Sequence, residues 1–174
     1  MDLSKLANWS EIASSVAVII TLVFLTIGVR QNTSALKAQT GQAVLASAQA
    51  ELGVMMDNPE VAVYLATTGQ LTSAEEHVRL NAWFTSIFRS REYAWLQFQS
   101  GAIDEAQWGT EVNVIMAILD SSRYRGWWDA LGRNYFGENF VGFIDSKIAE
   151  APASDQLWPA ITSWSVSEPE TMTE

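Results

Sequence analysis

The longest apolar run of the chain lies near its amino-terminal end. Residues 12–29 contain no charged side chain, and Glu11 and Arg30 bound them on either side. These eighteen residues, at a helical rise of about 1.5 Å each, extend roughly 27 Å, close to the thickness of the hydrocarbon core of a bilayer. The pattern therefore predicts that residues 1–30 form an N-terminal segment with a single transmembrane helix.

Two other structures also produce an apolar run. A cleaved signal peptide begins with a cationic region and ends at a small-residue cleavage site, but here Lys5 is accompanied by Asp2 and Glu11, and no Ala-x-Ala pattern follows. A buried core helix normally has a polar face, whereas this run has only four hydroxyl side chains. They are Ser14, Ser15, Thr21 and Thr26. We therefore favour the membrane span.

Residues 31–57 predict a helix that continues directly from the span. The segment is rich in Ala, Gln, Ser and Leu and contains no proline. Asn58 and Pro59 are expected to end it, because the residue before a proline is disfavoured in helical conformation. Small and apolar residues recur at spacings of three and four, which predicts a seam that packs lengthwise against another helix. The seam consists of Ala38, Gly41, Leu45, Ala48, Leu52 and Met55.

Residues 58–150 predict a domain of about four to five helices. A short helix is expected over 59–67. Ser73 and Glu76 form a capping box, the clearest helix-start signal in the chain, and open a helix that reaches about Ser100. Its apolar positions form a broad stripe, which predicts the central helix of the domain. These positions are Leu80, Trp83, Phe84, Ile87, Phe88, Ala94, Trp95 and Phe98.

Three further helices follow in the pattern. Asp104 and Gln107 repeat the start signal. Ser122 is expected to cap a helix that runs to Arg133, and apolar spacing predicts a last helix over 138–149. No stretch alternates apolar and polar residues as a strand does. We therefore predict an all-α chain, whose short connections make the domain a compact antiparallel helical bundle.

Residues 151–174 form an acidic tail. The tail contains Pro152, Pro159 and Pro169 and no positively charged side chain, a composition typical of disorder. It also contains two tryptophans, Trp158 and Trp164. These are the expected contact points if another part of the protein holds the tail.

The charge balance excludes one class of partner. Residues 31–174 hold eight basic and eighteen acidic side chains, so the net charge of −10 belongs to the part outside the predicted span. Nucleic acid needs a cationic face and is not an expected partner, whereas the lipid bilayer is. The chain has no cysteine, which removes disulfides, thiolate metal sites and cysteine nucleophiles.

Basic residues near the span indicate its orientation. Arg30 and Lys37 follow the span, whereas only Lys5 and the terminal amine precede it, beside two acids. Basic residues concentrate on the cytoplasmic side of membrane spans. We therefore expect the C-terminal domain to be cytoplasmic.

Small residues on one face of the span predict close packing with another membrane helix. Ser14, Thr21 and Gly28 are spaced by seven, and Ala17 lies between the first two. Small side chains let two helices approach closely in lipid. The expected partners are other membrane-protein subunits, or a second copy of this chain in a homo-oligomer.

Residues 121–128, Ser-Ser-Arg-Tyr-Arg-Gly-Trp-Trp, combine two arginines with three aromatic rings. Such a mixture is typical of the core of a protein interface or of a contact with lipid headgroups. The alternative is that both tryptophans are buried in the bundle while the arginines stay in solvent, and the sequence does not decide between the two. With the tryptophans of the tail, the candidate interface residues are Arg123, Arg125, Trp127, Trp128, Trp158 and Trp164.

Candidate catalytic chemistry is sparse. Glu92 lies among bulky apolar residues, which can raise the pKa of a carboxyl group and make it an acid or base. Arg89, three residues upstream, favours a structural ion pair with Glu92 instead. His77 is the only histidine and has no companion at metal-ligand spacing. We expect no catalytic residue, no metal and no cofactor.

Three segments together carry a resemblance to a group of known sequences. Residues 9–45, the helix with Arg89 to Phe98, and Gly126-Trp127-Trp128 resemble a widespread group of uncharacterised bacterial proteins with one N-terminal span and a small helical domain. The similarity covers residues 9 to about 149, and its most distinctive part is Val-Arg-Gln-Asn-Thr at 29–33. The resemblance implies a bacterial inner-membrane protein and carries no activity.

Three functions fit these features. The first is a non-enzymatic accessory or scaffold subunit that docks into a larger membrane assembly through its span. The second is a membrane-tethered binding or sensory module, whose aromatic domain recognises a ligand or a soluble partner. The third is a membrane-anchored enzyme of unknown reaction, for which Glu92 is the residue to test. We favour the first because of the small-residue face, the long exit helix and the many aromatic residues.

Overall fold

The computed structural model describes residues 3–66 and 71–163, and these residues form helices and no strand. The prediction of an all-α chain is thereby confirmed. The helices expected between residues 58 and 150 have counterparts in α2 to α6, and a further helix, α7, lies in the predicted tail. The elements are α1 (Leu3–Asp57), α2 (Pro59–Ala66), α3 (Ala74–Gln99), α4 (Glu105–Leu119), α5 (Ser122–Ala130), a short 3₁₀ helix (Gly132–Tyr135), α6 (Glu138–Glu150) and α7 (Leu157–Ser163).

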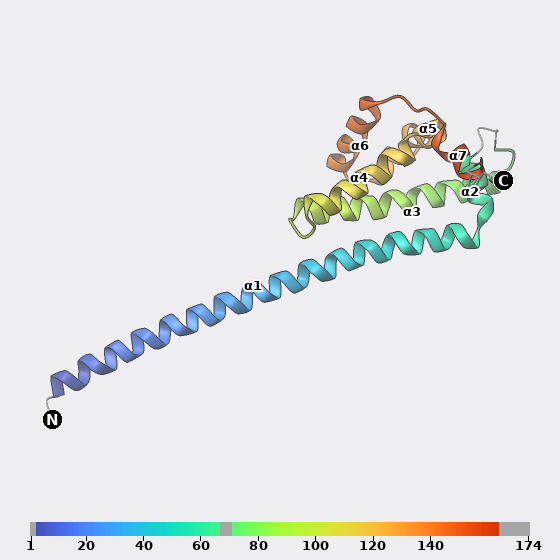
Figure 1. Cartoon of the computed structure of the whole chain (residues 1–174). Coiled ribbons are helices and arrows are strands. Elements are labelled where there is room, and N and C mark those ends of the chain that lie inside the picture. Colours follow the sequence, from blue (N-terminus) through green and yellow to red (C-terminus); the bar gives the residue numbers. More distant parts are fainter. Residues whose placement is uncertain (1–2, 67–70, 164–174) are drawn as a thin grey trace, which may run out of the picture.

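α1 is one helix of 55 residues, and most of it extends beyond the rest of the chain (Figure 1). It contains one segment that is long and apolar enough to cross a membrane, judged by length and composition. Every described side chain from residue 9 to residue 39 is exposed. The apolar run is therefore not buried in a core formed by the described part of the chain.

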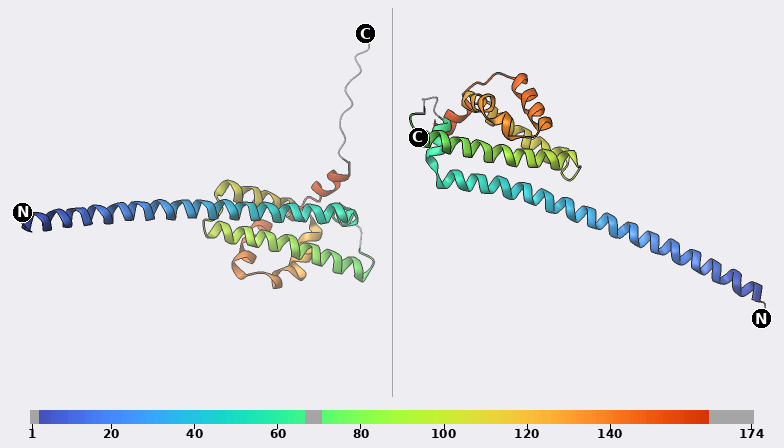
Figure 2. Two further views of the ribbon diagram at one scale, coloured as in Figure 1. Left: turned by 90° about the horizontal axis from the view of Figure 1, so that it is seen from below. Right: turned by 180° about the vertical axis from the view of Figure 1, so that it is seen from behind.

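The remaining helices form a head on one side of the last part of α1. α3 runs back along α1, α4 returns beside α3, and α5 and α6 lie farther from α1 (Figures 1 and 2). α2 packs against α7 near the end of α1. The central position predicted for α3 agrees with this arrangement, because α3 contacts both α1 and α4.

Local sequence signals set the helix ends of the head. Ser73 caps α3 in a complete capping box with Glu76, and Asp104 caps α4 by accepting a hydrogen bond from the amide of Gln107. α3 ends before Gly101, whose φ of +71° lies in the left-handed region that glycine adopts readily. The expected cap at Ser122 is wrong: Ser122 is the first residue of α5, and Ser121 occupies the cap position without a side-chain hydrogen bond.

α1 contacts the head through a line of residues that only partly coincides with the predicted seam, since Gly41, Ala48 and Met55 belong to both. Leu45 and Leu52 are 59% and 61% exposed, whereas Val44 is only 8% exposed and Glu51 is half-buried. The line that faces the head runs through positions 41, 44, 48, 51 and 55, which again alternates spacings of three and four. The prediction was wrong for Leu45 and Leu52, whose places on the buried line are taken by Val44 and Glu51, and an apolar pattern cannot reveal that a glutamate belongs to that line.

Aromatic rings fill the core around α3. The ring centroids of Phe84 and Tyr124 are 3.8 Å apart, and those of Phe88 and Trp128 are 5.2 Å apart. Tyr124, Phe88 and Trp128 are fully buried. Offset and edge contacts between such rings stabilise a core beyond the area that they bury, which accounts for part of the high aromatic content.

Alanine substitutions at two glycines of the head are expected to change its stability in opposite directions. A Cβ at Gly132 would lie 2.8 Å from Cε3 of Trp128 and 2.9 Å from Cζ3 of Trp127, whereas a Cβ at Gly142 would meet nothing within 4 Å. We expect Gly132→Ala to destabilise the head by about 1–3 kcal/mol through overpacking. Gly142→Ala should stabilise it by about 1 kcal/mol, because alanine favours the interior of a helix. Urea denaturation of both variants checks the prediction, and equal shifts of the two midpoints would contradict it.

The candidate junction between the long helix and the head

A buried charged cluster joins α1 to the head. Arg91 of α3 lies between Glu51 of α1 and Glu111 of α4, and its Nη2 atom is 2.6 Å from Oε2 of Glu51. Its Nη1 atom donates a hydrogen bond to Oε2 of Glu111, and the hydroxyl of Ser90 donates one to Oε1 of Glu51. Arg91 is 4% exposed and Glu111 8%. A charged group this deeply buried is stable only when it is paired and hydrogen-bonded.

Each member of the cluster occupies a core position of its own helix. On α3, Arg91 continues the line of buried residues formed by Leu80, Phe84 and Ile87. Glu111 follows Trp108 and precedes other buried residues of α4 at helical spacing. The sequence pattern indicated an ion pair between Arg89 and Glu92 and did not indicate this cluster. Charged residues on the apolar line of each helix were the signal that could have found it.

The Glu51 carboxyl group has an altered proton affinity. Burial raises the pKa of Glu51 above its ordinary value of 4.5, and the nearby charge of Glu111 raises it further, while the Ser90 hydroxyl and the Arg91 guanidinium oppose the shift. The folded protein therefore holds this proton more tightly than the unfolded chain does. The contribution of such a group to stability is fully present below its pKa in the unfolded chain. It is lost as pH rises through its pKa in the folded protein.

The raised pKa of Glu51 predicts that the stability of the head depends on pH, and that a substitution of Glu51 reduces this dependence. Between pH 4.5 and neutrality, part of the stability of the head should be lost as Glu51 ionises. Glu51→Gln cannot ionise, so its stability should decline less over the same range. Urea midpoints measured at a series of pH values test this, because parallel curves for the two proteins would contradict the assignment.

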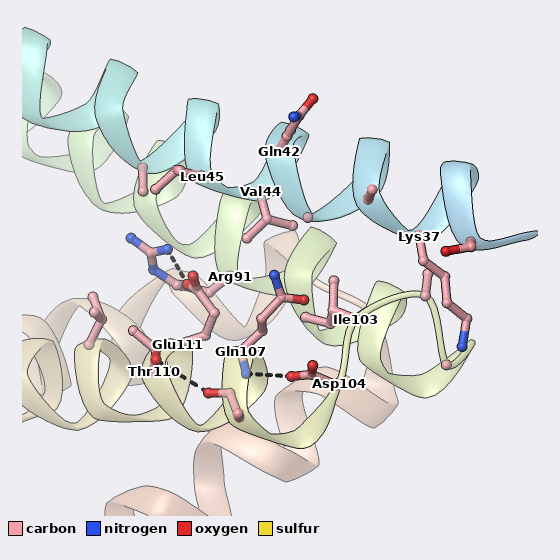
Figure 3. A pocket seen from close by; sticks show the side chains of 18 residues that line it. Lys37, Gln42, Val44, Leu45, Arg91, Ile103, Asp104, Gln107, Thr110 and Glu111 are labelled. Atoms are coloured by element: carbon pink, nitrogen blue, oxygen red, sulfur yellow. Dashed lines mark hydrogen bonds and ion pairs between the residues drawn. The ribbon is translucent and has the colours of Figure 1, made fainter.

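A groove lies beside the charged cluster, between α1, the loop that follows α3, and α4. Its volume is about 830 Å³. Figure 3 shows Arg91 and Glu111 at one end and Lys37 at the other, nearer the N-terminal part of α1. Gln107 closes part of the space between the helices, and a Cβ at Gly41 would lie 2.8 Å from its Nε2 atom. The groove has a mostly apolar wall with a charged inner end.

A second, smaller cavity of about 190 Å³ lies between α1, α3, α4 and α7. Trp83, Arg91 and Trp158 are among the residues that line it. The Nε1 atom of Trp83 and the Nε atom of Arg91 are buried and have no hydrogen-bond partner within the described chain, and the same holds for the Tyr124 hydroxyl. Burial also raises the pKa of Tyr124 above its ordinary range. Most buried polar atoms in proteins have a partner, so these three make this part of the core unusually polar.

The small residues predicted to pack the span lie on exposed positions of α1. Ser14, Ala17, Thr21 and Gly28 are all uncovered. The hydroxyl groups of Ser14 and Thr21 donate hydrogen bonds to carbonyl oxygens four residues earlier in the same helix. A Cβ at Gly28 would meet nothing within 4 Å. This face is therefore available to another helix, and its packing stays a prediction.

The two tryptophans of the segment 121–128 lie inside the head. Trp127 and Trp128 are 9% and 0% exposed. Their ring N–H groups donate hydrogen bonds to Oδ1 of Asn81 and Oδ1 of Asp145, both at 2.9 Å. This placement corresponds to the alternative interpretation, in which both rings are part of the core.

The two arginines of that segment are half-buried and donate to backbone carbonyls. Arg123 donates to the carbonyl of Tyr64. Arg125 donates from Nε to the carbonyl of Leu119 at 2.6 Å and from Nη1 to that of Ile148 at 3.2 Å. These contacts hold α5 to α2, α4 and α6, in place of the solvent exposure that the alternative interpretation assumed.

Arg89 and Glu92 lie together at the edge of the head. Nη1 of Arg89 is 2.6 Å from Oε2 of Glu92, and Oε1 of Glu92 accepts a hydrogen bond of 2.8 Å from the amide of Gly137. Arg89 also lies over the ring of Phe136, 5.0 Å from its centroid. The pair thus connects α3 to the start of α6. His77 is exposed, with Nδ1 2.9 Å from the carbonyl oxygen of Ser73.

Part of the predicted tail is ordered on the head. Trp158 donates a hydrogen bond of 3.2 Å to the carbonyl of Ala117, and its ring lies 6.3 Å from that of Tyr124. The expectation of disorder is therefore wrong for Leu157–Ser163, which form α7. Trp164 lies outside the described residues.

The Asp120 carboxylate holds the chain that leads into α7. It accepts a hydrogen bond of 2.6 Å from the Ser154 hydroxyl and others from the amides of Ser154, Gln156 and Leu157. The Ser154 hydroxyl and these amides hold the pKa of Asp120 below its ordinary value of 3.8. Such a group contributes stability that is fully present above the unfolded pKa and is lost as pH falls through the folded pKa.

Acidification is therefore expected to loosen this segment. Below about pH 4, amide hydrogen exchange at residues 154–157 should accelerate in the wild type relative to the intrinsic rate at each pH. Asp120→Asn should be less protected at neutral pH and should lack the acid-dependent change. Unchanged protection of the wild type down to pH 2 would show that Asp120 does not hold the segment.

Among residues 3–66 and 71–163, no three acidic or histidine side chains converge to hold a metal ion. No protein-family model, curated protein or solved structure matches this chain. The junction between α1 and the head must therefore be interpreted from its own geometry, which is that of a buried structural link beside an open groove.

Proposed function

We propose that this chain is a non-enzymatic accessory or scaffold subunit of a bacterial inner-membrane assembly, which docks through its single span. In this proposal residues 12–29 cross the bilayer, and the head is a compact antiparallel bundle on the cytoplasmic side. The observation that carries the proposal is the uncovered length of α1, exposed at every described residue from 9 to 39. Apolar surface on that scale indicates contact with lipid or with another protein.

The charged cluster supports a scaffold role, because it fixes how the head sits on the long helix. Glu51 is the only acidic side chain of α1 between Arg30 and Met56, and it enters the head to meet Arg91. A buried ion pair discriminates against other registers more effectively than apolar contacts do, since a slipped register leaves a buried charge without its partner. The head is thereby held in one position relative to the span.

A native gel tests docking through the span. Membranes from cells that produce the tagged full chain are extracted with a mild detergent, and the chain is expected to migrate in an assembly well above its monomer mass of 19.2 kDa. Gly28→Leu should shift most of the chain to the monomer, because a large side chain keeps the partner helix away. Val23→Leu, also exposed but off the small-residue face, is the matched control. A wild type that migrates as a lone monomer would contradict the proposal.

The cytoplasmic position of the head has a separate test. Alkaline phosphatase is active only when exported from the cytoplasm, so a fusion to the C-terminus should be inactive in intact cells. The same enzyme fused before the span should be active. The reverse pattern would overturn the orientation that Arg30 and Lys37 indicate.

The groove beside Arg91 favours a second candidate function, a membrane-tethered ligand-binding module. Its volume of about 830 Å³ is within the range of small-molecule sites, and a mostly apolar wall with a few polar groups is typical of them. Thr110, exposed on α4, lines this groove. If the groove serves the function, Thr110→Trp should abolish the cellular role while leaving the native-gel assembly intact. An unaffected cellular role would leave docking through the span as the better account.

A further inference from the structure

The outer face of α1 continues from the span into the part of the helix beside the head. We define it by two lines, each counted in steps of seven residues: positions 35, 42, 49 and 56, and positions 38, 45 and 52. All of these residues are exposed, and Leu45, Leu52 and Met56 are 59%, 61% and 81% exposed. Counted backward, the first line passes through Gly28, Thr21 and Ser14, and the second through Gln31, Phe24 and Ala17. Apolar residues at a heptad spacing are the mark of a helix that pairs lengthwise with another helix.

Lipid cannot cover this outer face. Leu45 follows Val29, the last apolar residue of the span, by sixteen positions, which places it about 24 Å farther along the helix. The polar headgroup layer is only about 5–7 Å thick on each side of the hydrocarbon core. Under the proposed function, on which this inference rests, Leu45 and Leu52 therefore stand in water unless a protein covers them.

The charges of α1 between positions 30 and 56 lie on a different line. Arg30, Lys37 and Glu51 occur at multiples of seven residues from one another, and Val44, 8% exposed against the head, lies on the same line. The head covers that side of α1 and leaves the rest of the helix surface bare (Figures 1 and 2). The outer face therefore carries no charge between positions 31 and 56. A partner helix that binds through charged side chains would find no opposite charge on this face.

We infer that the outer face of α1 seats the α1 helix of a second copy, parallel and in register. Two identical spans lie at the same depth in a bilayer and point the same way, so each residue of the face meets its own counterpart across a two-fold axis. Gln42 and Gln49 then face Gln42 and Gln49 of the other copy. A glutamine amide both donates and accepts hydrogen bonds, so it is complementary to itself. Leucine, which occurs at positions 45 and 52 of the second line, is the residue that two-stranded parallel coiled coils carry at the corresponding position.

The extent of the face suits a stable dimer. From Ser14 to Met56 the helix is about 63 Å long, and a strip about 10 Å wide over that length covers roughly 600 Å² on each copy. This is similar to the roughly 800 Å² per partner of typical stable interfaces. Gln42 and Leu45 also line the groove, so the second helix would lie along its edge and narrow its opening.

The absence of cysteine makes the inference directly testable. Single cysteines are introduced into the full chain at Leu45 and Gln49 on the outer face, and as controls at Ala43 and Ala50, which are also exposed but lie off it. Native membranes are treated with copper phenanthroline. A disulfide needs Cβ atoms about 4 Å apart, so Leu45→Cys and Gln49→Cys should form a dimer at twice 19.2 kDa at least tenfold faster than Ala43→Cys and Ala50→Cys.

The outcomes separate this inference from the proposed function. Equal rates at all four positions, faster cross-linking at the controls, or no dimer at any position would overturn the second copy as the occupant. If the native gel shows a large assembly and no dimer forms, a different subunit covers the face and the proposed function stands. If the native gel shows a monomer, the proposed function itself fails. Co-purification of two differently tagged copies gives an independent readout, since it requires no substitution in the face.

Discussion

Replacing Arg91 with methionine is expected to destabilise the head by about 3–5 kcal/mol, the usual cost of removing one partner from a buried ion pair. The substitution leaves the carboxylates of Glu51 and Glu111 buried beside each other without the cation that both contact. The Arg91 guanidinium opposes the rise in the pKa of Glu51, so Glu51 should take up a proton more readily in the variant and the loss should be smaller at low pH. Urea denaturation of the detergent-solubilised full chain, followed by circular dichroism, measures the loss.

Two comparisons identify the cause of the Arg91→Met effect. Arg133→Met removes two pairs of a half-exposed guanidinium, one with Asp129 and one with Asp145, and the loss of each should cost less than about 1 kcal/mol. The combined variant Glu51→Met, Arg91→Met, Glu111→Met should recover much of the stability, because an apolar replacement of a complete buried cluster is often neutral. If Arg91→Met alone were no worse than Arg133→Met, the cluster would not be a structural link.

Truncating Trp128 is expected to have an effect of similar size. The ring is fully buried and contacts the rings of Phe88 and Phe136 at centroid distances of 5.2 and 5.5 Å. Trp128→Ala should therefore cost about 3–5 kcal/mol through the cavity that it leaves, and it also removes the hydrogen-bond donor to Asp145. Trp9→Ala, 72% exposed on α1, is the matched control. The urea midpoints of the two variants, measured in the same way, test this prediction. Comparable midpoints would mean that the aromatic core does not depend on the Trp128 ring.

The sequence predicted the helices well where local chemistry sets them. The capping box of Ser73 and Glu76 and the proline after α1 act within a few residues of the ends that they determine. The predicted end of the helix that starts at Ser122 was less accurate. The pattern extended it to Arg133, whereas α5 stops at Ala130 and a 3₁₀ turn begins at Gly132. A Cβ at Gly132 would meet the rings of Trp127 and Trp128, five and four residues earlier, and the spacing of apolar residues does not reveal this close local contact.

The candidate site was harder to predict because it depends on three helices at once. Glu51, Arg91 and Glu111 are separated by 40 and 20 positions along the chain, and each taken alone resembles an ordinary exposed charge. Only their places on the buried line of each helix distinguish them. The ordered start of the tail was missed for a similar reason, since Asp120 binds residues more than 30 positions away.

Under the proposed function, in which residues 12–29 cross the bilayer, the unbroken α1 helix also couples the geometry of the bilayer to the head. No proline or turn interrupts it between residue 12 and Asp57, so rotation of the membrane segment about its axis would swing the head through the same angle. One residue inserted near position 33 would turn the head by about 100° and lift it by about 1.5 Å. A change in the tilt of the span would likewise displace the head sideways. The displacement would be larger at the head than in the span, because the head lies at the far end of a rigid helix.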